Sequence, residues 1–201
     1  MIIDLKQRTT TDWSKFDSYK KSMESLIFVD KKNIKDDGAC CLDFTIGERW
    51  FNQSNSQWYI IPDDGIILKS TEAITIETNE KLGVPLNVFG VVTGVGRNIY
   101  SGGMVSSGKI DPGFNGKLRI GFFNSSRKKM TLKKGETICA CYFIQSETSI
   151  VAPLPAYIDE SQSLPTKGGF KVKKFLLANW DKILTIAIAG FALYVSILAL
   201  K

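Results

Sequence analysis

Short runs of β-branched and aromatic residues, separated by turn formers, fill the chain from Ala39 to Ile144. Runs of this kind form strands, and clusters of Gly, Pro and Asp form the turns between them. No helical pattern alternates with these runs, as a doubly wound α/β fold needs. We therefore expect an all-β domain, a compact sandwich or barrel of hairpins. Its turns are expected at Asp63-Asp64-Gly65, Gly102-Gly103, Asp111-Pro112-Gly113 and Lys133-Lys134-Gly135.

One short amphipathic helix is expected before the strands, in an N-terminal helical segment of residues 1–35. Asp12 is a suitable N-cap residue for it. Helical spacing relates the apolar residues that follow, which are Trp13, Phe16, Met23, Leu26 and Ile27. This segment is expected to pack beside the β domain of residues 36–148.

The last part of the chain contains an uncharged apolar run of 18 residues, Ile183–Leu200. As a helix it would be about 27 Å long, which is enough to cross the hydrocarbon core of a bilayer. Apolar residues surround the whole helix, which argues against a buried core helix or an interfacial one. We predict one transmembrane helix over residues 180–201, joined to the β domain by a flexible basic arm over residues 149–179.

The residues before the apolar run predict the topology. Trp180 occupies an interface position, and lysines crowd the stretch just before the apolar run at positions 167, 171, 173, 174 and 182. By the positive-inside rule, the chain is a single-pass membrane protein with a C-terminal anchor and a cytoplasmic N-terminal domain. Its partner there is the lipid bilayer. Small residues also recur on one stripe of the helix, which favours self-association: Thr185, Ala189, Ala192, Ser196 and Ala199.

The formal net charge of +6 could indicate a nucleic-acid partner, but most of the excess lies in the arm. The other basic cluster, Arg127-Lys128-Lys129 with Lys133 and Lys134, flanks a turn signal at Asn124-Ser125-Ser126 and is interpreted as a solvated loop. We therefore expect no nucleic-acid partner.

The sequence contains four cysteines and no histidine. Cys40, Cys41, Cys139 and Cys141 fit neither zinc spacing nor a disulfide-linked secreted domain, so we expect reduced core residues. The lack of histidine excludes His-based general bases, Ser-His-Asp nucleophiles and His-ligated metals. Any catalysis must use carboxylates.

The segment Gly108-Lys109-Ile110-Asp111-Pro112-Gly113-Phe114-Asn115-Gly116, followed by Leu118 and Asn124, resembles the central motif shared by dUTPases and dCTP deaminases. The resemblance covers roughly residues 38–145, and other motifs follow in the family's order. These are Leu42-Asp43 with Gly47, Thr93-Gly94-Val95-Gly96, and Gly135-Glu136-Thr137-Ile138 leading to Tyr142-Phe143. It implies an all-β fold of the β-clip type, a homotrimer, and nucleotide sites shared between subunits.

The resemblance also implies roles for individual residues in binding a deoxynucleoside triphosphate. Thr93, Gly94 and Gly96 lie in a turn similar to the family's phosphate-contacting Ser-Gly-Leu-Gly, where glycines let backbone N–H groups approach phosphate. Asp111 would activate the water that attacks the α-phosphorus. Asp43 would hold, through water, the magnesium ion bound to the triphosphate.

Three further substrate contacts are implied by the same resemblance. Gly108 opens the central motif, and Phe114 replaces the tyrosine that packs on deoxyribose. Phe170 lies in Lys167-Gly168-Gly169-Phe170, which is similar to the glycine-rich arm whose phenylalanine stacks on uracil. The same stretch can instead be a membrane-proximal basic linker.

Departures from the family pattern decide between activities. Gly121 stands where deaminases have a proton-shuttling glutamate, so deamination is not expected. Val92 replaces a phosphate-binding arginine and Ala140 a glutamine, which weakens phosphate binding unless Arg97 or Lys167 substitutes. Arg97 is the better candidate, because deaminases of the family use an arginine at the corresponding place.

Structural alternatives stay open for these residues. Asp43 and Asp111 can be turn residues that bond their own backbone. The glycine turn can be a hairpin alone, and Phe114 can be a core aromatic.

Three functional hypotheses follow. The first is a membrane-tethered, magnesium-dependent hydrolase of dUTP or a related deoxynucleotide. The second is a catalytically eroded nucleotide sensor whose trimeric head controls a membrane helix bundle. The third is a membrane scaffold without nucleotide chemistry.

Overall fold

The computed structural model describes residues 1–30 and 40–148 of the 201-residue chain. The chain divides into two units, Met1–Pro165 and Thr166–Lys201, and all described residues belong to the first. Its elements, in chain order, are β1 (Thr9–Thr10), η1 (Trp13–Lys15), α1 (Phe16–Tyr19), β2 (Ile27–Val29), β3 (Leu42–Asn52), β4 (Gln57–Ile60), β5 (Ile66–Leu68), β6 (Ala73–Gly83), β7 (Val88–Gly94), α2 (Gly96–Tyr100), β8 (Gly103–Val105), β9 (Gly108–Ile110), β10 (Asn115–Asn124), β11 (Met130–Leu132) and β12 (Thr137–Gln145). The predicted mostly-β class with a short N-terminal helix is confirmed.

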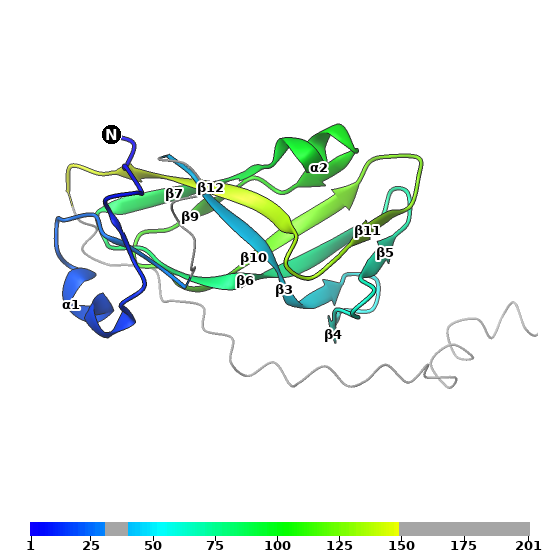
Figure 1. Cartoon of the computed structure of the whole chain (residues 1–201), viewed down its shortest axis with the longest axis horizontal. Coiled ribbons are helices and arrows are strands. Elements are labelled where there is room, and N and C mark those ends of the chain that lie inside the picture. Colours follow the sequence, from blue (N-terminus) through cyan, green and yellow to red (C-terminus); the bar gives the residue numbers. More distant parts are fainter. Residues whose placement is uncertain (31–39, 149–201) are drawn as a thin grey trace, which may run out of the picture. The chain divides into compact units, whose positions relative to one another are not determined.

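Strand β3 joins the two halves of the main sheet (Figure 1). Its first residues pair with β12, which pairs with β7, and β7 pairs with β9. Its later residues pair with β6 and β4, and β6 also pairs with β10 and β2. The register shifts between Ile46 and Trp50, where Gly47 lies so close to β6 that an added Cβ would be 2.7 Å from the carbonyl oxygen of Glu77. Only glycine lets the two strands approach this closely.

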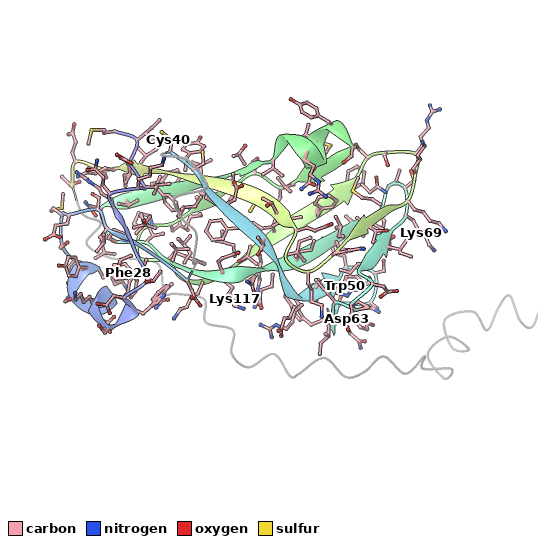
Figure 2. The ribbon with its side chains drawn as sticks, in the orientation of Figure 1. Phe28, Cys40, Trp50, Asp63, Lys69 and Lys117 are labelled. Carbon is pink, nitrogen blue, oxygen red and sulfur yellow. The ribbon has the colours of Figure 1, made fainter. Side chains whose placement is uncertain are left out.

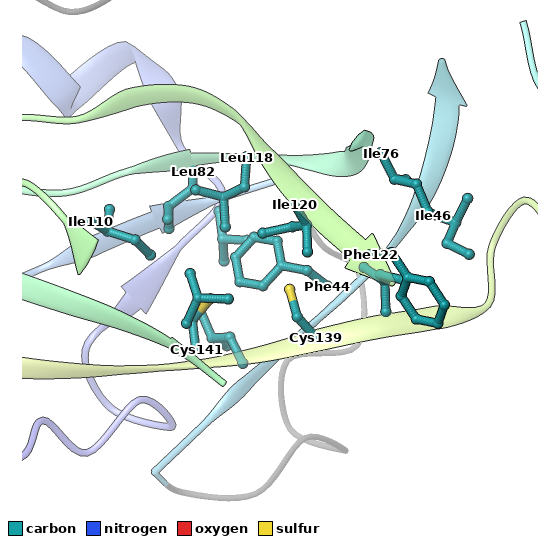
Figure 3. Packing of buried hydrophobic residues seen from close by; sticks show 14 of the residues in the cluster. Phe44, Ile46, Ile76, Leu82, Ile110, Leu118, Ile120, Phe122, Cys139 and Cys141 are labelled. Atoms are coloured by element: carbon teal, nitrogen blue, oxygen red, sulfur yellow. The ribbon is translucent and has the colours of Figure 1, made fainter. Parts of the chain in front are cut away.

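One apolar core fills the space between the two halves. Leu82, Leu118 and Ile120 come from β6 and β10, and they approach Phe44 of β3 and Cys141 of β12 (Figure 3). In the first part of β3 the buried residues Leu42, Phe44 and Ile46 alternate with less buried ones, as the period of a strand with one face on a core requires. In β12 the core residues Cys139, Cys141 and Phe143 also lie two positions apart, but Ala140 on the other face is only 8% exposed as well. The opposite face of β3, β12 and β7 therefore lies outside this core.

The four predicted turns are confirmed: three connect strands, and the one at Gly102 connects α2 to β8. Gly65, Gly113 and Gly135 have φ values of +94°, +82° and +78°, and Gly102 has +87°. L-residues with side chains rarely adopt these angles, so the sequence had to place glycine here. The signal at 124–126 also lies where predicted, between β10 and β11.

The N-terminal helix is shorter than the apolar spacing predicts. Asp12 does cap it, since its side chain accepts a hydrogen bond from the Ser14 amide, but the helical turns end at Tyr19. The extension through Met23, Leu26 and Ile27 was wrong. Ser25 has a φ of +57°, which ends any helix, and Ile27 begins strand β2.

The cysteines divide into two pairs. Cys139 and Cys141 are buried in the core, as predicted, whereas Cys40 is exposed and Cys41 is half-buried, so the core assignment was wrong for Cys40 and Cys41. A hydrogen bond with Cys139, together with burial and the nearby charge of Asp43, raises the pKa of the Cys141 thiol. Burial also raises the pKa of Cys41. Raised pKa values keep these thiols protonated and unreactive.

No helix within residues 1–30 and 40–148 is long and apolar enough to cross a membrane. The predicted span Ile183–Leu200 and the arm with Lys167 and Phe170 lie outside the described residues. They stay predictions.

Candidate functional site

A row of three predicted site positions crosses the outer face of the sheet. Ala140 of β12 pairs with Asp43 of β3 on one side and with Thr93 of β7 on the other. Directly paired residues point to the same face, and the neighbours of Asp43 and Ala140 in their strands are buried in the core. Asp43, Ala140 and Thr93 therefore face away from the core together.

The Thr93–Gly96 turn joins this row to helix α2. Strand β7 ends at Gly94, Val95 is the N-cap residue, and α2 begins at Gly96. The turn is a strand-to-helix junction, so the alternative of a simple hairpin was wrong. An added Cβ at Gly94 would lie 3.1 Å from Val105, and one at Gly96 would lie 3.2 Å from the Tyr100 ring. Both glycines thus permit close packing at the junction.

Helix α2 presents Arg97 beside the start of β12. The Arg97 guanidinium lies 3.7 Å from the Glu136 carboxylate and its side chain is 79% exposed. The next residue, Asn98, donates from its side-chain amide to the carbonyl oxygens of Thr137 (3.2 Å) and Ile138 (3.3 Å). These two bonds fix α2 to β12. Arg97 is therefore an exposed cation on an anchored helix that follows Thr93 closely in the chain.

Asp111 occupies the turn between β9 and β10, and its side chain is 37% exposed. One carboxylate oxygen accepts a hydrogen bond of 2.8 Å from the ammonium of Lys109. The Asp111 backbone carbonyl accepts from the Phe114 amide, at 3.1 Å, which closes the turn. The carboxylate is thus paired with a cation and still reaches solvent, as a group that activates water requires.

Gly108 and Phe114 flank this turn differently. Gly108 is exposed, pairs with Val92, and has no atom within 4 Å of an added Cβ. Phe114 is half-buried and packs against the apolar core. The alternative of a core aromatic is therefore correct for the part of the Phe114 ring that packs on the core. The remaining part of the ring is exposed to solvent.

The two substituted family positions lie on opposite faces of the sheet. Val92 is 4% exposed and belongs to the core, so a side chain at position 92 points away from Thr93 and Asp43. Ala140 lies between Asp43 and Thr93 on the outer face and carries no hydrogen-bonding group. Arg97 is consequently the cation that α2 supplies near this row.

Asp43 and Asp111 are far apart within one protomer. Three strand-to-strand steps and about four residues along the strands separate them across the order β3-β12-β7-β9. Strand spacings of about 4.8 Å and rises of about 3.4 Å per residue give about 20 Å in total. A single triphosphate bound to this protomer does not meet both carboxylates at once.

A separate apolar cavity of about 310 Å³ surrounds Gly121. The Gly121 amide donates to the Ser106 hydroxyl (3.0 Å), and the Gly121 carbonyl accepts from the Ser106 amide (2.8 Å). No carboxylate is among the residues that line it, which are Gln53, Ala73, Ile74, Met104, Val105, Ser106, Gly121, Phe122 and Phe123. Within the described part of the chain, this cavity has no group that could shuttle protons as a glutamate would.

The donor set fits magnesium bound mainly by a substrate. Residues 1–30 and 40–148 contain no group of three or more His, Cys, Asp or Glu side chains that could hold a metal ion by themselves. Mg²⁺ commonly keeps several waters and binds through one or two carboxylates plus substrate phosphates. Asp43, on the outer face, could supply one such carboxylate through water.

Sequence patterns did not reveal two residues that shape the site. Lys109 could have been found, since it lies only two positions before Asp111 and its long side chain reaches that carboxylate. Asn98 leaves no local signal, because its partners are carbonyl groups of a strand far along the chain. Phe170 lies outside the described residues.

Comparison with known proteins extends across most of the described domain. A family model described as dCTP deaminase-like matches residues 31–146. A dCTP deaminase of Shewanella frigidimarina is 30% identical over 96 residues, which cover 47% of this chain and 50% of the relative. One from Buchnera aphidicola subsp. Baizongia pistaciae is 36% identical over 96 residues, covering 46% and 50%. The chain thus spans about half the length of the curated relatives it matches.

A solved structure supports the likeness of fold. The 2'-deoxycytidine 5'-triphosphate deaminase of Agrobacterium tumefaciens superimposes with a TM-score of 0.54 at 11% identity, covering 71% of this chain and 47% of that chain. At this identity the likeness concerns the mostly-β fold alone.

Proposed function

Because this chain belongs to the dCTP deaminase-like family, we propose that its domain binds a pyrimidine deoxynucleoside triphosphate and hydrolyses it to the monophosphate and pyrophosphate. The observation that carries the proposal is the outer-face row of Asp43, Ala140 and Thr93, together with the exposed cation Arg97 on helix α2, which follows Thr93 in the chain. A carboxylate, a hydroxyl, backbone amides and a guanidinium together form a set of groups suited to a triphosphate with its metal. The substrate we favour is dUTP.

Hydrolysis requires only a few groups of this chain. Asp111 would take a proton from water while the water oxygen bonds to the α-phosphorus and the bond to the α–β bridging oxygen breaks, releasing pyrophosphate. Magnesium, when bound to the triphosphate, would neutralise charge on the phosphate oxygens. Asp43 would orient the water shell of that ion, and Thr93 with Arg97 would hold the phosphates.

Hydrolysis fits the described residues better than deamination. Attack on a cytosine ring needs a group that transfers protons at the base, and the lining of the Gly121 cavity offers one hydroxyl, Ser106, and no carboxylate. The accessible carboxylate at Asp111 favours activation of water at phosphorus instead.

The site is proposed to form between protomers of a homotrimer. The separation of about 20 Å between Asp43 and Asp111 within one chain supports this, because a neighbouring protomer would have to supply one of them. The predicted helix Ile183–Leu200 further leads us to propose a C-terminal membrane anchor with the domain on the cytoplasmic side. Retention of the full chain in membranes after alkaline extraction, and its release without residues 180–201, would test the anchor.

The test of the reaction is a substrate panel. Full-length protein with Mg²⁺ is incubated with dUTP, dCTP, dTTP and UTP, and release of pyrophosphate and of ammonia is followed. We expect pyrophosphate from dUTP and no ammonia from dCTP. Absence of pyrophosphate from every nucleotide removes the hydrolase proposal.

A second function, a nucleotide sensor without turnover, is favoured by one observation. Position 92 points into the core and position 140 is alanine, so two of the family's phosphate contacts are missing from the outer face. Titration calorimetry with dUTP and dCTP separates the two functions, because a sensor binds a nucleotide that it does not cleave. Lack of any binding counts against both.

A further inference from the structure

A basic surface at one end of the domain contains none of the residues of the proposed nucleotide site, although Glu136 bonds both the Arg97 guanidinium of that site and the Lys133 amide of this surface. We name it the β5–β11 face. It lies at the end of the molecule away from α1 (Figure 1), and Lys69, which belongs to it, lies far from Phe28 (Figure 2). It consists of Ile67, Lys69, Arg127, Lys128, Lys129, Thr131 and Lys133, all of them exposed.

The two short strands present these side chains in one direction. Leu68 pairs with Met130, Ile67 with Thr131, and Ile66 with Leu132. The leucines are 1% and 4% exposed, whereas Ile67 is 61% exposed, so alternate residues form an outer layer. Beyond the Leu68–Met130 pair, the next residues of the two antiparallel chains are Lys69 and Lys129. These two lysines therefore lie beside each other.

The positive charges on this face are not neutralised within the domain. Like charges on adjacent strands are destabilising. In the part of the chain that the structure describes, no ion pair involves any of the five cations of the face, although the neighbouring Lys134 pairs with Asp63 at 2.8 Å. The carboxylates of Glu72 and Glu136, each three residues along the chain, accept hydrogen bonds from the backbone amides of Lys69 and Lys133 and pair with none of these cations. The face therefore keeps an uncompensated charge.

The loops that carry the charges are held firmly. Asn124 is fully buried, and its side-chain amide donates to the carbonyl oxygens of Leu68, Lys69 and Lys128 at 3.2, 3.0 and 2.8 Å. The Ser70 hydroxyl donates to the Ser126 carbonyl at 2.7 Å. These bonds tie the segment after β5 to the segment before β11. The cations consequently project from a fixed platform, which lowers the entropy lost when they bind a partner.

We infer that the β5–β11 face is a docking surface for the anionic lipid headgroups of a membrane. Clustered Lys and Arg side chains are attracted to an anionic leaflet. Ile67, an exposed aliphatic side chain among them, can enter the headgroup region, as apolar residues of surface-bound proteins do. Single-stranded nucleic acid is the less suitable partner, because its bases stack on aromatic rings and this face has none.

The chain itself offers a reason for membrane proximity. Thirty-four residues separate the last described residue, Thr148, from the uncharged run Ile183–Leu200, the predicted membrane anchor. Docking through the β5–β11 face would also fix which side of the domain meets the bilayer, which a membrane anchor alone does not do. The inference about this face does not depend on the predicted helix.

The test uses lysine labelling of the full chain, because distant lysines in the same molecule are internal controls. The protein is incorporated into vesicles of phosphatidylcholine alone or with about 30% phosphatidylglycerol, and amine acetylation is measured by mass spectrometry. Lys69, Lys128, Lys129 and Lys133 should be protected only in the anionic vesicles, and about 0.5 M NaCl should remove the protection. Lys15, Lys20, Lys21 and Lys117 should be labelled equally in both.

A charge-reversal variant extends the test. Lys69→Glu/Lys128→Glu/Lys129→Glu should lose protection of Lys133, while the matched variant Lys15→Glu/Lys20→Glu/Lys21→Glu should keep it. Removing each cation is expected to weaken partitioning about fivefold, so three together about a hundredfold. Equal labelling in both lipids, or no association with the anionic vesicles, overturns the proposal. Protection by a single-stranded oligonucleotide and not by anionic lipid overturns it in favour of nucleic acid.

Discussion

At the scale of single residues, the ion pair between Lys109 and Asp111 carries the proposed chemistry. Asp111→Asn should lower kcat for pyrophosphate release by about 10²–10⁴-fold, since an amide cannot accept the proton of water. The KM for the nucleotide should change little. The matched control is Asp63→Asn, because Asp63 also pairs with a lysine at 2.8 Å on an exposed turn. Equal loss of activity in both variants, or in neither, contradicts the assignment.

The buried thiols predict a dependence of stability on pH. A hydrogen bond with Cys139 and burial raise the pKa of Cys141 above its ordinary value of 9.0. Above that pH, the unfolded thiol ionises while the folded one stays protonated, so the free energy of unfolding falls as pH rises. Urea unfolding between pH 7 and pH 10 should show a shallower fall for Cys139→Ala/Cys141→Ala than for the natural protein. If the free energy of unfolding falls equally with pH in the variant and in the natural protein, the Cys141 thiol is not the source of the pH dependence.

At the scale of elements, the N-terminal helix is placed by a glycine of β6. A Cβ added at Gly83 would lie 2.6 Å from the Phe16 ring and 3.0 Å from Trp13. Gly83→Ala should therefore push η1 and α1 from the sheet and destabilise the domain by about 1–3 kcal/mol. Gly108→Ala is the control, because nothing lies within 4 Å of its added Cβ. Denaturant melts that are the same for the two variants contradict this packing.

Local chemistry explains which elements the sequence could predict. The turns at Gly65, Gly113 and Gly135 were predictable, because a positive φ requires glycine at each. The helix was predicted too long, since apolar spacing alone cannot distinguish Ile27 in a helix from Ile27 in strand β2, which is formed by pairing with β1 and β6.

The candidate site was predictable only as far as family motifs reach. The motif around Asp111 identifies the turn, but its pairing with Lys109 depends on strand alternation. To predict the row formed by Asp43, Ala140 and Thr93, one must know the registers of β12 with β3 and with β7. These pairings join residues that are far apart in sequence. Likewise, only the topology shows that Val92 points into the core.

At the scale of the whole molecule, the distance between Asp43 and Asp111 predicts complementation between protomers. Asp43→Asn and Asp111→Asn should each be inactive alone. When the two variants are co-expressed and assemble together, a site that takes one carboxylate from each of two protomers is intact in about a quarter of cases. Pyrophosphate release should recover to about that fraction. No recovery in assemblies shown to contain both variants contradicts a shared site.

The start of the chain lies against the end of its last strand. The Gln145 amide donates to the Met1 carbonyl at 2.9 Å, and Arg8 donates to the Gln145 side chain at 3.2 Å. A fusion partner attached before Met1 would therefore crowd the point where the polypeptide leaves β12 toward its final residues. Reporter domains or affinity tags are better inserted at the exposed hairpin tip Ser54-Asn55, between β3 and β4.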